Sequence, residues 1–112
     1  MKTPPRTSEA VVVTLVPWPA LTRRNYEKFN EFFASAVGPE ARLVVDLQRV
    51  EAMDGWGVRA LVEASRRAAQ AGARVKYCGM TRRVRALLET VRLHHVCDLH
   101  NDRDEALLAF QL

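Results

Sequence analysis

Hydrophobic and polar residues are arranged along this chain in two alternating patterns. Short runs of apolar, often β-branched residues predict strands, and apolar residues repeated every three or four positions predict amphipathic helices. The predicted strands cover residues 10–16, 42–47, 74–79 and 96–99, and the predicted helices begin near residues 21, 54, 81 and 102. Because each helix can serve as a crossover between parallel strands, we predict an α/β fold: a small, mostly parallel β-sheet with about four helices packed against it.

Residues that favour helix ends support these boundaries. Asp54, Thr81 and Asp102 are suited to cap helix starts. Glu105 lies at capping-box spacing from Asp102, and Gly72 can end the second helix. Helical spacing predicts a core-facing stripe in each of two helices, made of Val58, Leu61, Ala64, Ser65, Ala68 and Ala71 in the second and of Val84, Leu87, Leu88 and Val91 in the third. Only one strand is predicted before the first helix.

Length and composition predict one domain with a buried core, since the chain has 112 residues of which 48% are hydrophobic. Residues 1–8 are polar and proline-bearing, so we expect a disordered N-terminal lead followed by a single domain over residues 9–112. No run approaches the ~20 apolar residues of a membrane-spanning helix, and residues 1–8 lack the apolar core of a signal peptide. We therefore expect a cytoplasmic protein without membrane insertion, in which Cys78 and Cys97 remain thiols.

The chain is basic, with a formal net charge of +4 and a sequence pI of about 9.6. A positive charge is compatible with weak attraction to anionic partners, nucleic acid included. The arginines are spread over several predicted helices and strands, however, and no basic stripe with interleaved aromatic residues is present. A solvated helical face is the favoured interpretation, and nucleic-acid binding is the alternative.

Residues capable of catalysis or metal binding do not form a recognisable site. The stretch from His94 to His100 contains three histidines and Cys97, but alternation along a predicted strand sends neighbouring side chains to opposite faces. Surface histidines on a sheet rim are therefore favoured over a zinc site. Cys78 lies in an apolar strand and is expected to be an inert packed thiol. With neither a Gly-rich phosphate loop nor a catalytic triad, we expect no enzyme activity, cofactor or metal.

The stretch Asp54-Gly55-Trp56-Gly57 is the strongest candidate for a functional site, because it joins an apolar strand to a helix. Asp54 can cap the helix, contact a partner, or do both. Gly55 and Gly57 are expected to serve the backbone in two ways: freedom in φ for a tight entry into the helix, and the absence of a side chain for close approach of a neighbouring segment. Trp56 could fill the core, but its glycine neighbours offer little shielding, so partial exposure and a role as an interface anchor are favoured.

The motifs around this stretch resemble those of the STAS domain family, found in bacterial anti-sigma-factor antagonists and at the ends of sulfate transporters. In that family an apolar strand ending in Asp-Leu is followed by Asp-Ser-Ser-Gly or a near variant, a helix, a glycine, a strand, and a helix rich in Val and Leu. The matching stretches are Val44-Val45-Asp46-Leu47, Asp54-Gly55-Trp56-Gly57-Val58, Ala71-Gly72-Ala73-Arg74-Val75 and Val84-Arg85-Ala86-Leu87-Leu88. The likeness covers residues 42–110 well and 9–41 loosely, since the family usually begins with two strands. It implies a STAS-like fold.

The resemblance also implies a function. In the switching members, an anti-sigma factor that is a kinase phosphorylates a serine between the Asp and the Gly, which ends the partnership. Gly55 and Trp56 occupy those positions here, and neither bears a hydroxyl, so the usual switch cannot operate. The resemblance implies a non-enzymatic interaction module that binds an anti-sigma factor or related regulatory kinase. The expected partner-binding residues are Asp54, Gly55, Trp56, Gly57, Arg59, Glu63 and Arg66. The alternative is an accessory subunit that binds the ATPase of a lipid-transport ABC complex.

Overall fold

The structure, a computed structural model, describes residues 12–15 and 17–111, so the expected lead at residues 1–8 lies outside it. The strands are β1 (Val12–Leu15), β2 (Ala20–Leu21), β3 (Arg42–Asp46), β4 (Ala52–Met53), β5 (Arg74–Cys78) and β6 (Leu99–His100). The helices are α1 (Tyr26–Ala36), α2 (Gly55–Ala71), α3 (Arg82–Thr90) and α4 (Arg103–Ala109), together with a short 3-10 helix, η2 (Leu93–His95).

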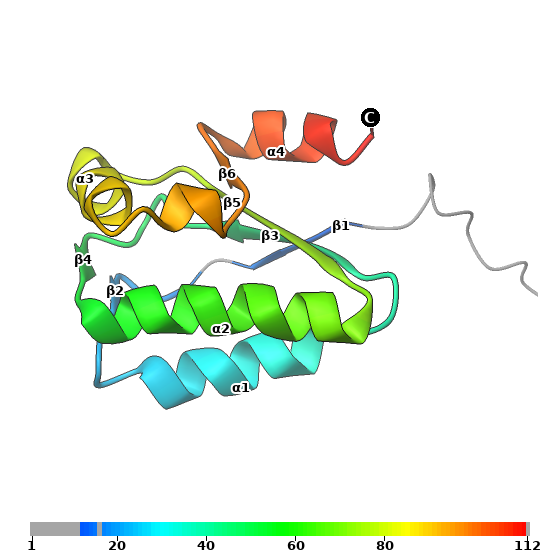
Figure 1. The fold of residues 1–112 in the computed structure, drawn as a ribbon, viewed down its shortest axis with the longest axis horizontal. Helices are drawn as coiled ribbons and strands as arrows, with labels where there is room; N and C mark the ends of the chain where they lie inside the picture. The colour runs from blue at the N-terminus through cyan, green and yellow to red at the C-terminus, as the bar shows by residue number, and fades with distance from the viewer. Residues whose placement is uncertain (1–11, 16, 112) are drawn as a thin grey trace, which may run out of the picture.

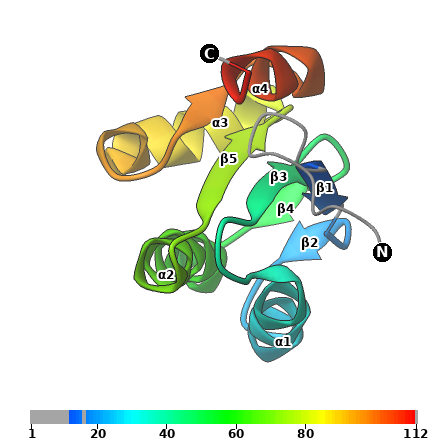
Figure 2. The same cartoon turned by 90° about the vertical axis from the view of Figure 1, so that its right-hand side faces the viewer.

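The main sheet has four strands in the order β1-β3-β5-β6, and all of its pairings are parallel. A second sheet consists of the parallel pair β2 and β4. Helices α1 and α2 lie on one face of the main sheet and α4 lies on the other, while α3 lies near the end at which the strands finish (Figure 1, Figure 2). The predicted architecture, a small parallel sheet with four helices, is confirmed.

The central strand is β3, which pairs with β1 on one side and β5 on the other. Its first four residues are buried, and three of them, Leu43, Val44 and Val45, are completely inaccessible to solvent. A near-continuous apolar run is expected of a parallel strand that is covered on both faces. Leu43 and Val45 face the large core beneath α1 and α2, and Val44 faces a small cluster beneath α4.

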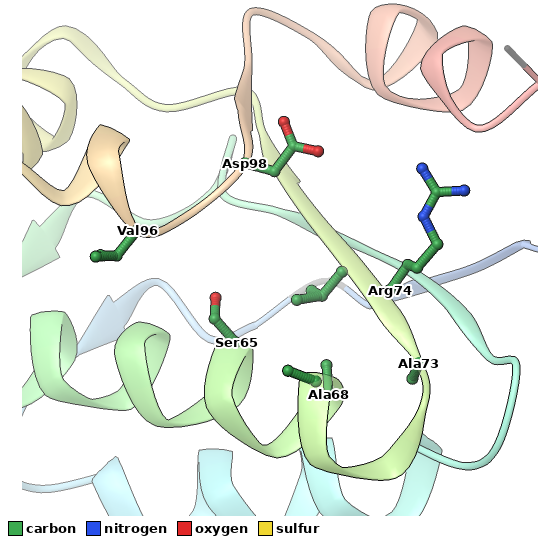
Figure 3. Close-up of a pocket in the computed structure, with 8 residues that line it drawn as sticks. Ser65, Ala68, Ala73, Arg74, Val96 and Asp98 are labelled. Carbon is green, nitrogen blue, oxygen red and sulfur yellow. The ribbon is translucent and has the colours of Figure 1, made fainter.

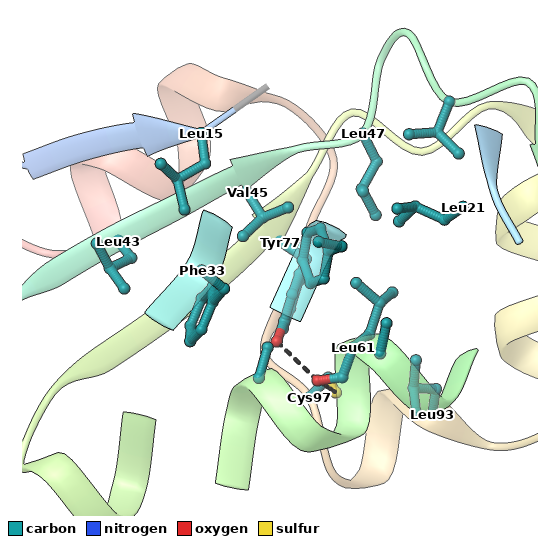
Figure 4. Packing of buried hydrophobic residues seen from close by; sticks show 14 of the residues in the cluster. Leu15, Leu21, Phe33, Leu43, Val45, Leu47, Leu61, Tyr77, Leu93 and Cys97 are labelled. Atoms are coloured by element: carbon teal, nitrogen blue, oxygen red, sulfur yellow. Dashed lines mark hydrogen bonds between the residues drawn. The ribbon is translucent and has the colours of Figure 1, made fainter. Parts of the chain in front are cut away.

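Tyr77 lies at the centre of the larger core and is fully buried (Figure 4). Its hydroxyl donates to the carbonyl oxygen of Leu61 in α2 at 2.9 Å. Because that donation uses the only hydroxyl hydrogen, Ser65 Oγ at 2.8 Å must donate to Tyr77, which leaves Ser65 free to accept from Cys97 Sγ at 3.2 Å. Burial raises the pKa of the Tyr77 hydroxyl. The core therefore contains a polar chain in which each donor has an acceptor.

Helix α4 is attached to its face of the sheet through Phe110. The Phe110 ring lies 5.2 Å from the Arg74 guanidinium and 4.9 Å from Lys76 Nζ, both at cation–π range. Lys76 is itself almost buried and forms an ion pair with Asp98. Cys78 lies in the same small cluster, between the sheet and α4. This helix is therefore held by a few apolar contacts and two cations.

Two predictions about strands are wrong. The chain has a second strand before α1, because β2 pairs with β4, and each is only two residues long. The predicted strand over residues 96–99 is displaced, because Arg92 adopts a left-handed conformation with φ of 57° and begins η2. Only Leu99 and His100 remain to pair with β5. The predicted inward position of Val91 is also wrong, since α3 ends at Thr90 and Val91 is 47% exposed.

The predicted helix caps at Asp54, Thr81 and Asp102 are confirmed, because each carboxylate or hydroxyl accepts from a backbone N–H in the first turn of its helix. The capping box is altered, however. Asp102 accepts from the Glu105 amide at 2.8 Å, but the Glu105 carboxylate accepts from the amide of Asn101 rather than Asp102.

Gly72 ends α2 in a left-handed conformation with φ of 75°, whereas Gly38 does not have a positive φ. A Cβ added at either glycine would meet no other atom within 4 Å. Gly72→Ala is therefore expected to reduce the free energy of unfolding by about 1 kcal/mol through backbone strain alone. Gly38→Ala is the matched control and is expected to leave stability unchanged or slightly raised. Urea denaturation of both variants checks this, and equal effects at the two positions would contradict it.

Candidate functional site

The first turn of α2 is held by the side chain of Asp54. One carboxylate oxygen, Oδ1, accepts from the amides of Trp56 at 2.9 Å and Gly57 at 3.1 Å, while Asp54 itself has extended backbone angles. The other oxygen, Oδ2, accepts from the amide of Arg23 at 3.2 Å. Asp54 therefore caps α2 and also fixes the segment that leads into α1.

Gly57 is buried because the backbone of β2 crosses directly beside it. A Cβ at this position would lie 2.2 Å from the carbonyl oxygen of Leu21 and 2.6 Å from Cγ of Met53. The predicted close approach is therefore confirmed at Gly57. Gly55 has no neighbouring atom within 4 Å of a Cβ position, and neither glycine has a positive φ. The predicted freedom in φ is wrong at both positions, since α2 begins at Gly55 with ordinary helical geometry.

The Trp56 side chain lies at the surface, with 38% of its area exposed. Its indole packs edge-on against the ring of Tyr26 from α1, with ring centroids 5.1 Å apart and an interplanar angle of 69°. The guanidinium groups of Arg59 and Arg23 lie 5.4 Å and 6.0 Å from the indole centroid. The predicted partial exposure is confirmed, and the indole is supported by aromatic and cationic neighbours that leave part of it open to solvent.

Arg59 and Glu63 form an ion pair one helical turn apart, with Nε and Oε1 separated by 2.8 Å. Two residues of α1 complete the group through the other carboxylate oxygen of Glu63: the Tyr26 hydroxyl donates to Oε2, and Asn30 Nδ2 lies 3.5 Å from Oε2. The hydrogen bond from Tyr26, followed by that from Arg59, lowers the pKa of Glu63. The hydrogen bond to Glu63 raises the pKa of Arg59. The charged side chains beside the exposed indole, Arg59 and Glu63, are therefore held in place by their ion pair and by hydrogen bonds from α1.

Six of the seven predicted partner-binding residues lie together in the first turns of α2, namely Asp54, Gly55, Trp56, Gly57, Arg59 and Glu63. Arg66 stands apart, bordering a shallow groove of about 420 Å³ on the outer face of α2 with Glu63, Arg67 and Gln70. The sequence reasoning missed Arg23, Tyr26 and Asn30. Tyr26 and Asn30 are four residues apart on α1, so their polar groups share one side of the helix, next to the buried Phe29. This spacing indicates a helix flank in contact with a polar neighbour.

The histidine-rich stretch is distributed over separate environments. His94 and His95 are exposed on η2, whereas His100 is mostly buried in β6, so the prediction of surface histidines is wrong for His100. His100 lies 2.9 Å from Asp98 and 3.4 Å from Glu105. Within residues 12–15 and 17–111, no cluster of three or more His, Cys, Asp or Glu side chains is placed to bind a metal.

Both cysteines are free and buried. Burial raises the pKa of Cys78 to about 12, and burial also raises the pKa of Cys97. Because the thiolate is the reactive form of cysteine, neither side chain is suited to nucleophilic chemistry near neutral pH.

Nor does any helix in the described part of the chain have both the length and the apolar character needed to cross a bilayer.

A family model described as "Mlab, STAS domain" matches residues 3–107. A search of curated proteins finds no match. An anti-sigma-factor antagonist (STAS) domain protein from Planctomyces limnophilus shares 21% identity with a TM-score of 0.76, and the alignment covers 94% of this chain and 93% of that one.

Two transporter structures also share the fold. A sulfate transporter family protein from Wolinella succinogenes is 18% identical with a TM-score of 0.75, over 98% of this chain and 96% of that one. The murine anion transporter Slc26a9 is 19% identical with a TM-score of 0.77, over 89% of this chain and 18% of the transporter. At these identities the likeness establishes the fold alone.

The two glycines of the loop provide a matched test of the packing at the start of α2. Gly57→Ala places a methyl group against the Leu21 carbonyl and is expected to lower the free energy of unfolding by about 1–3 kcal/mol. Gly55→Ala meets no neighbour and improves helix propensity, so stability is expected to stay equal or rise by up to about 1 kcal/mol. Thermal and urea unfolding measure the stability of both variants. A Gly57→Ala variant as stable as the unchanged protein would refute the close packing of α2 on β2.

The lowered pKa of Glu63 predicts a pH dependence of stability. Because its folded pKa lies below its unfolded value, Glu63 contributes stability above the unfolded pKa, and this contribution is lost as the pH falls through the folded pKa. Tyr26→Phe removes the hydrogen bond that contributes most to the lowered pKa of Glu63, so this pKa is expected to move up toward its ordinary value. Carbon-detected NMR titration of the Glu63 carboxyl measures it. Asn30→Ala, which removes the smallest cause, is the control, and an unchanged Glu63 midpoint in Tyr26→Phe would contradict the assignment.

Proposed function

Since this chain belongs to the STAS domain family, we propose that it is a non-enzymatic module that binds a protein partner in the cytoplasm through the start of α2. The proposed surface, here called the docking face, consists of Asp54, Gly55, Trp56, Gly57, Arg59 and Glu63 with Arg23 and Tyr26 from the neighbouring segment. Arg66 extends it along the outer face of α2.

The observation that carries this proposal is the exposed but supported Trp56 ring. An indole that is already held by Tyr26 and Arg59 loses little conformational freedom when a partner covers it. Tryptophan and arginine are the residue types most often responsible for binding energy in interfaces, particularly where they are surrounded by groups that exclude water. The Arg59–Glu63 pair lies at the rim, where charges mainly guide orientation and association rate.

The leading partner is an anti-sigma factor or related regulatory kinase. Support comes from the shared fold with an anti-sigma-factor antagonist domain and from the position of the docking face at the start of the helix that carries the phosphorylated serine in switching members. Gly55 and Trp56 have no hydroxyl, so association is constitutive or is controlled by competition and abundance. Mass spectrometry of the protein from its native cell is expected to find no stoichiometric phosphate on Ser65 or Thr81, and finding it there would contradict constitutive association.

A second candidate, an accessory subunit that binds the ATPase of a lipid-transport ABC complex, is favoured by one observation. The matching family model is described as a Mlab STAS domain and not as an anti-sigma-factor antagonist. Affinity capture of the tagged chain from native lysate separates the two candidates: a kinase-like ATPase of the anti-sigma type supports the first, and an ABC ATPase supports the second.

The two tryptophans provide a matched test of the docking face. Trp56 and Trp18 are 38% and 39% exposed, and each packs edge-on against one aromatic ring, Tyr26 and Phe32 respectively. Trp56→Ala is expected to weaken binding of the captured partner by about 2 kcal/mol, roughly a thirtyfold increase in Kd. Trp18→Ala is expected to leave Kd unchanged. Titration calorimetry measures both, and equal losses in the two variants would overturn the assignment of the docking face.

A further inference from the structure

A second surface lies along the C-terminal half of α2, away from Trp56. Two adjoining grooves of about 260 and 330 Å³ share Ser65, Ala69 and Val96. We call the combined groove the β5 trough, bordered also by Ala73, Arg74 and Val75 (Figure 3). Figure 3 shows α2 on one side of the trough and β5 with the segment bearing Val96 and Asp98 on the other.

The floor of the trough includes an open edge of the main sheet. Strand β5 pairs with β3 along its whole length, but on its other side it pairs with β6 only at Tyr77 and Cys78. The Tyr77 amide donates toward that side, to the carbonyl of Asp98, at 2.8 Å. Backbone groups two residues apart in a strand point the same way, so the amide and carbonyl of Val75 also face the trough. Within residues 12–15 and 17–111, no strand pairs with β5 there.

The trough exists because the segment that follows η2 reaches β5 only at Asp98. The amides of Val96 and Cys97 both donate back to the carbonyl of Leu93, which ties this segment to η2 instead of to the sheet. Val96 is consequently 64% exposed, beside the small side chains of Ala69 and Ser65 on α2. The result is an apolar channel that runs beside unpaired strand backbone.

The charges around the trough are mainly positive. Asp98 is already paired with Lys76 and lies 2.9 Å from His100. Arg66 borders the trough on the α2 side and Arg74 borders it on the α4 side, where the Arg74 guanidinium lies against the Phe110 ring. Neither arginine forms an ion pair in the described part of the chain. An occupant that carries acidic residues therefore complements the rim.

We propose that the β5 trough binds an extended, acidic segment of a partner protein, which adds to β5 as a parallel or antiparallel strand. Its backbone pairs with the amide and carbonyl of Val75, and the small apolar side chains on one face of the segment pack on Ala69 and Val96. The acidic side chains alternate with them and point to the opposite face of the sheet, where Arg74 lies against Phe110. This surface meets the docking face only at Arg66 and does not require that face to be correct.

The test uses the full chain labelled with nitrogen-15 and a peptide of about seven residues in which valine and glutamate alternate, a typical strand length. Addition of the peptide is expected to shift the amide resonances of Ser65, Ala69, Val75 and Val96 in NMR spectra. Hydrogen exchange at the Val75 amide is expected to slow by about tenfold or more at saturation. The same peptide with lysine in place of glutamate is expected to bind roughly tenfold more weakly or not at all.

Two variants make the test specific. Val75→Pro removes the free N–H while keeping an apolar side chain, and proline is tolerated where a strand amide faces away from its neighbour. Ala69→Glu blocks the channel and repels an acidic segment, whereas Gln70→Glu, its neighbour on the outer face of α2, makes a similar charge change and serves as control. Val75→Pro and Ala69→Glu, the two blocking variants, are first checked for an intact fold by NMR. Both are expected to lose peptide binding, and Gln70→Glu is expected to retain it.

Absence of binding at millimolar peptide, equal binding of the lysine peptide, or retained binding by both blocking variants would each overturn the proposal. Shifts confined to the Trp56 region would do so as well, since they would assign the peptide to the docking face.

Discussion

The contact between the first turn of α2 and the carbonyl of Leu21 is the constraint on which the docking face depends. Strands β2 and β4 have only two residues each, too few to hold a position without further support. Gly57 lets the helix approach β2, and Asp54 joins the start of α2 to the segment before α1 through its two oxygens. The indole of Trp56 therefore projects from backbone that is fixed by the packing of Gly57 on β2 and by the hydrogen bonds that Asp54 accepts from the amides of Trp56, Gly57 and Arg23.

Helices α1 and α2 share the polar groups that surround this indole. Glu63 accepts from Tyr26 and Arg59 together, and Arg59 lies over the rings of both Tyr26 and Trp56. An exposed ion pair of this kind contributes little to folding stability. Its consequence is geometric, because it orients a guanidinium and two aromatic rings before any partner arrives. Such preorganisation reduces the entropy lost on association.

Features encoded within one segment could be predicted from the sequence, and features that depend on two segments could not. The apolar run of β3 and the caps at Asp54, Thr81 and Asp102 are local, and the structure has them as expected. The pairing of β2 with β4 needs two residues from each of two distant segments, which leaves no periodic pattern to read. The contact of Tyr26 with Trp56 depends on how α1 packs on α2, and the last strand differs from its prediction because a non-glycine residue, Arg92, adopts a left-handed conformation.

The two free thiols lie in different parts of the interior. Cys97 belongs to the large core beneath α2, whereas Cys78 lies between the sheet and the short helix that Arg74 and Lys76 hold through Phe110. A thiol reagent can reach each cysteine only when the layer above it opens. The labelling rates of the two sulfurs therefore report separately on fraying of the C-terminal helix and on opening of the main core, so the native chain carries its own pair of probes for local unfolding.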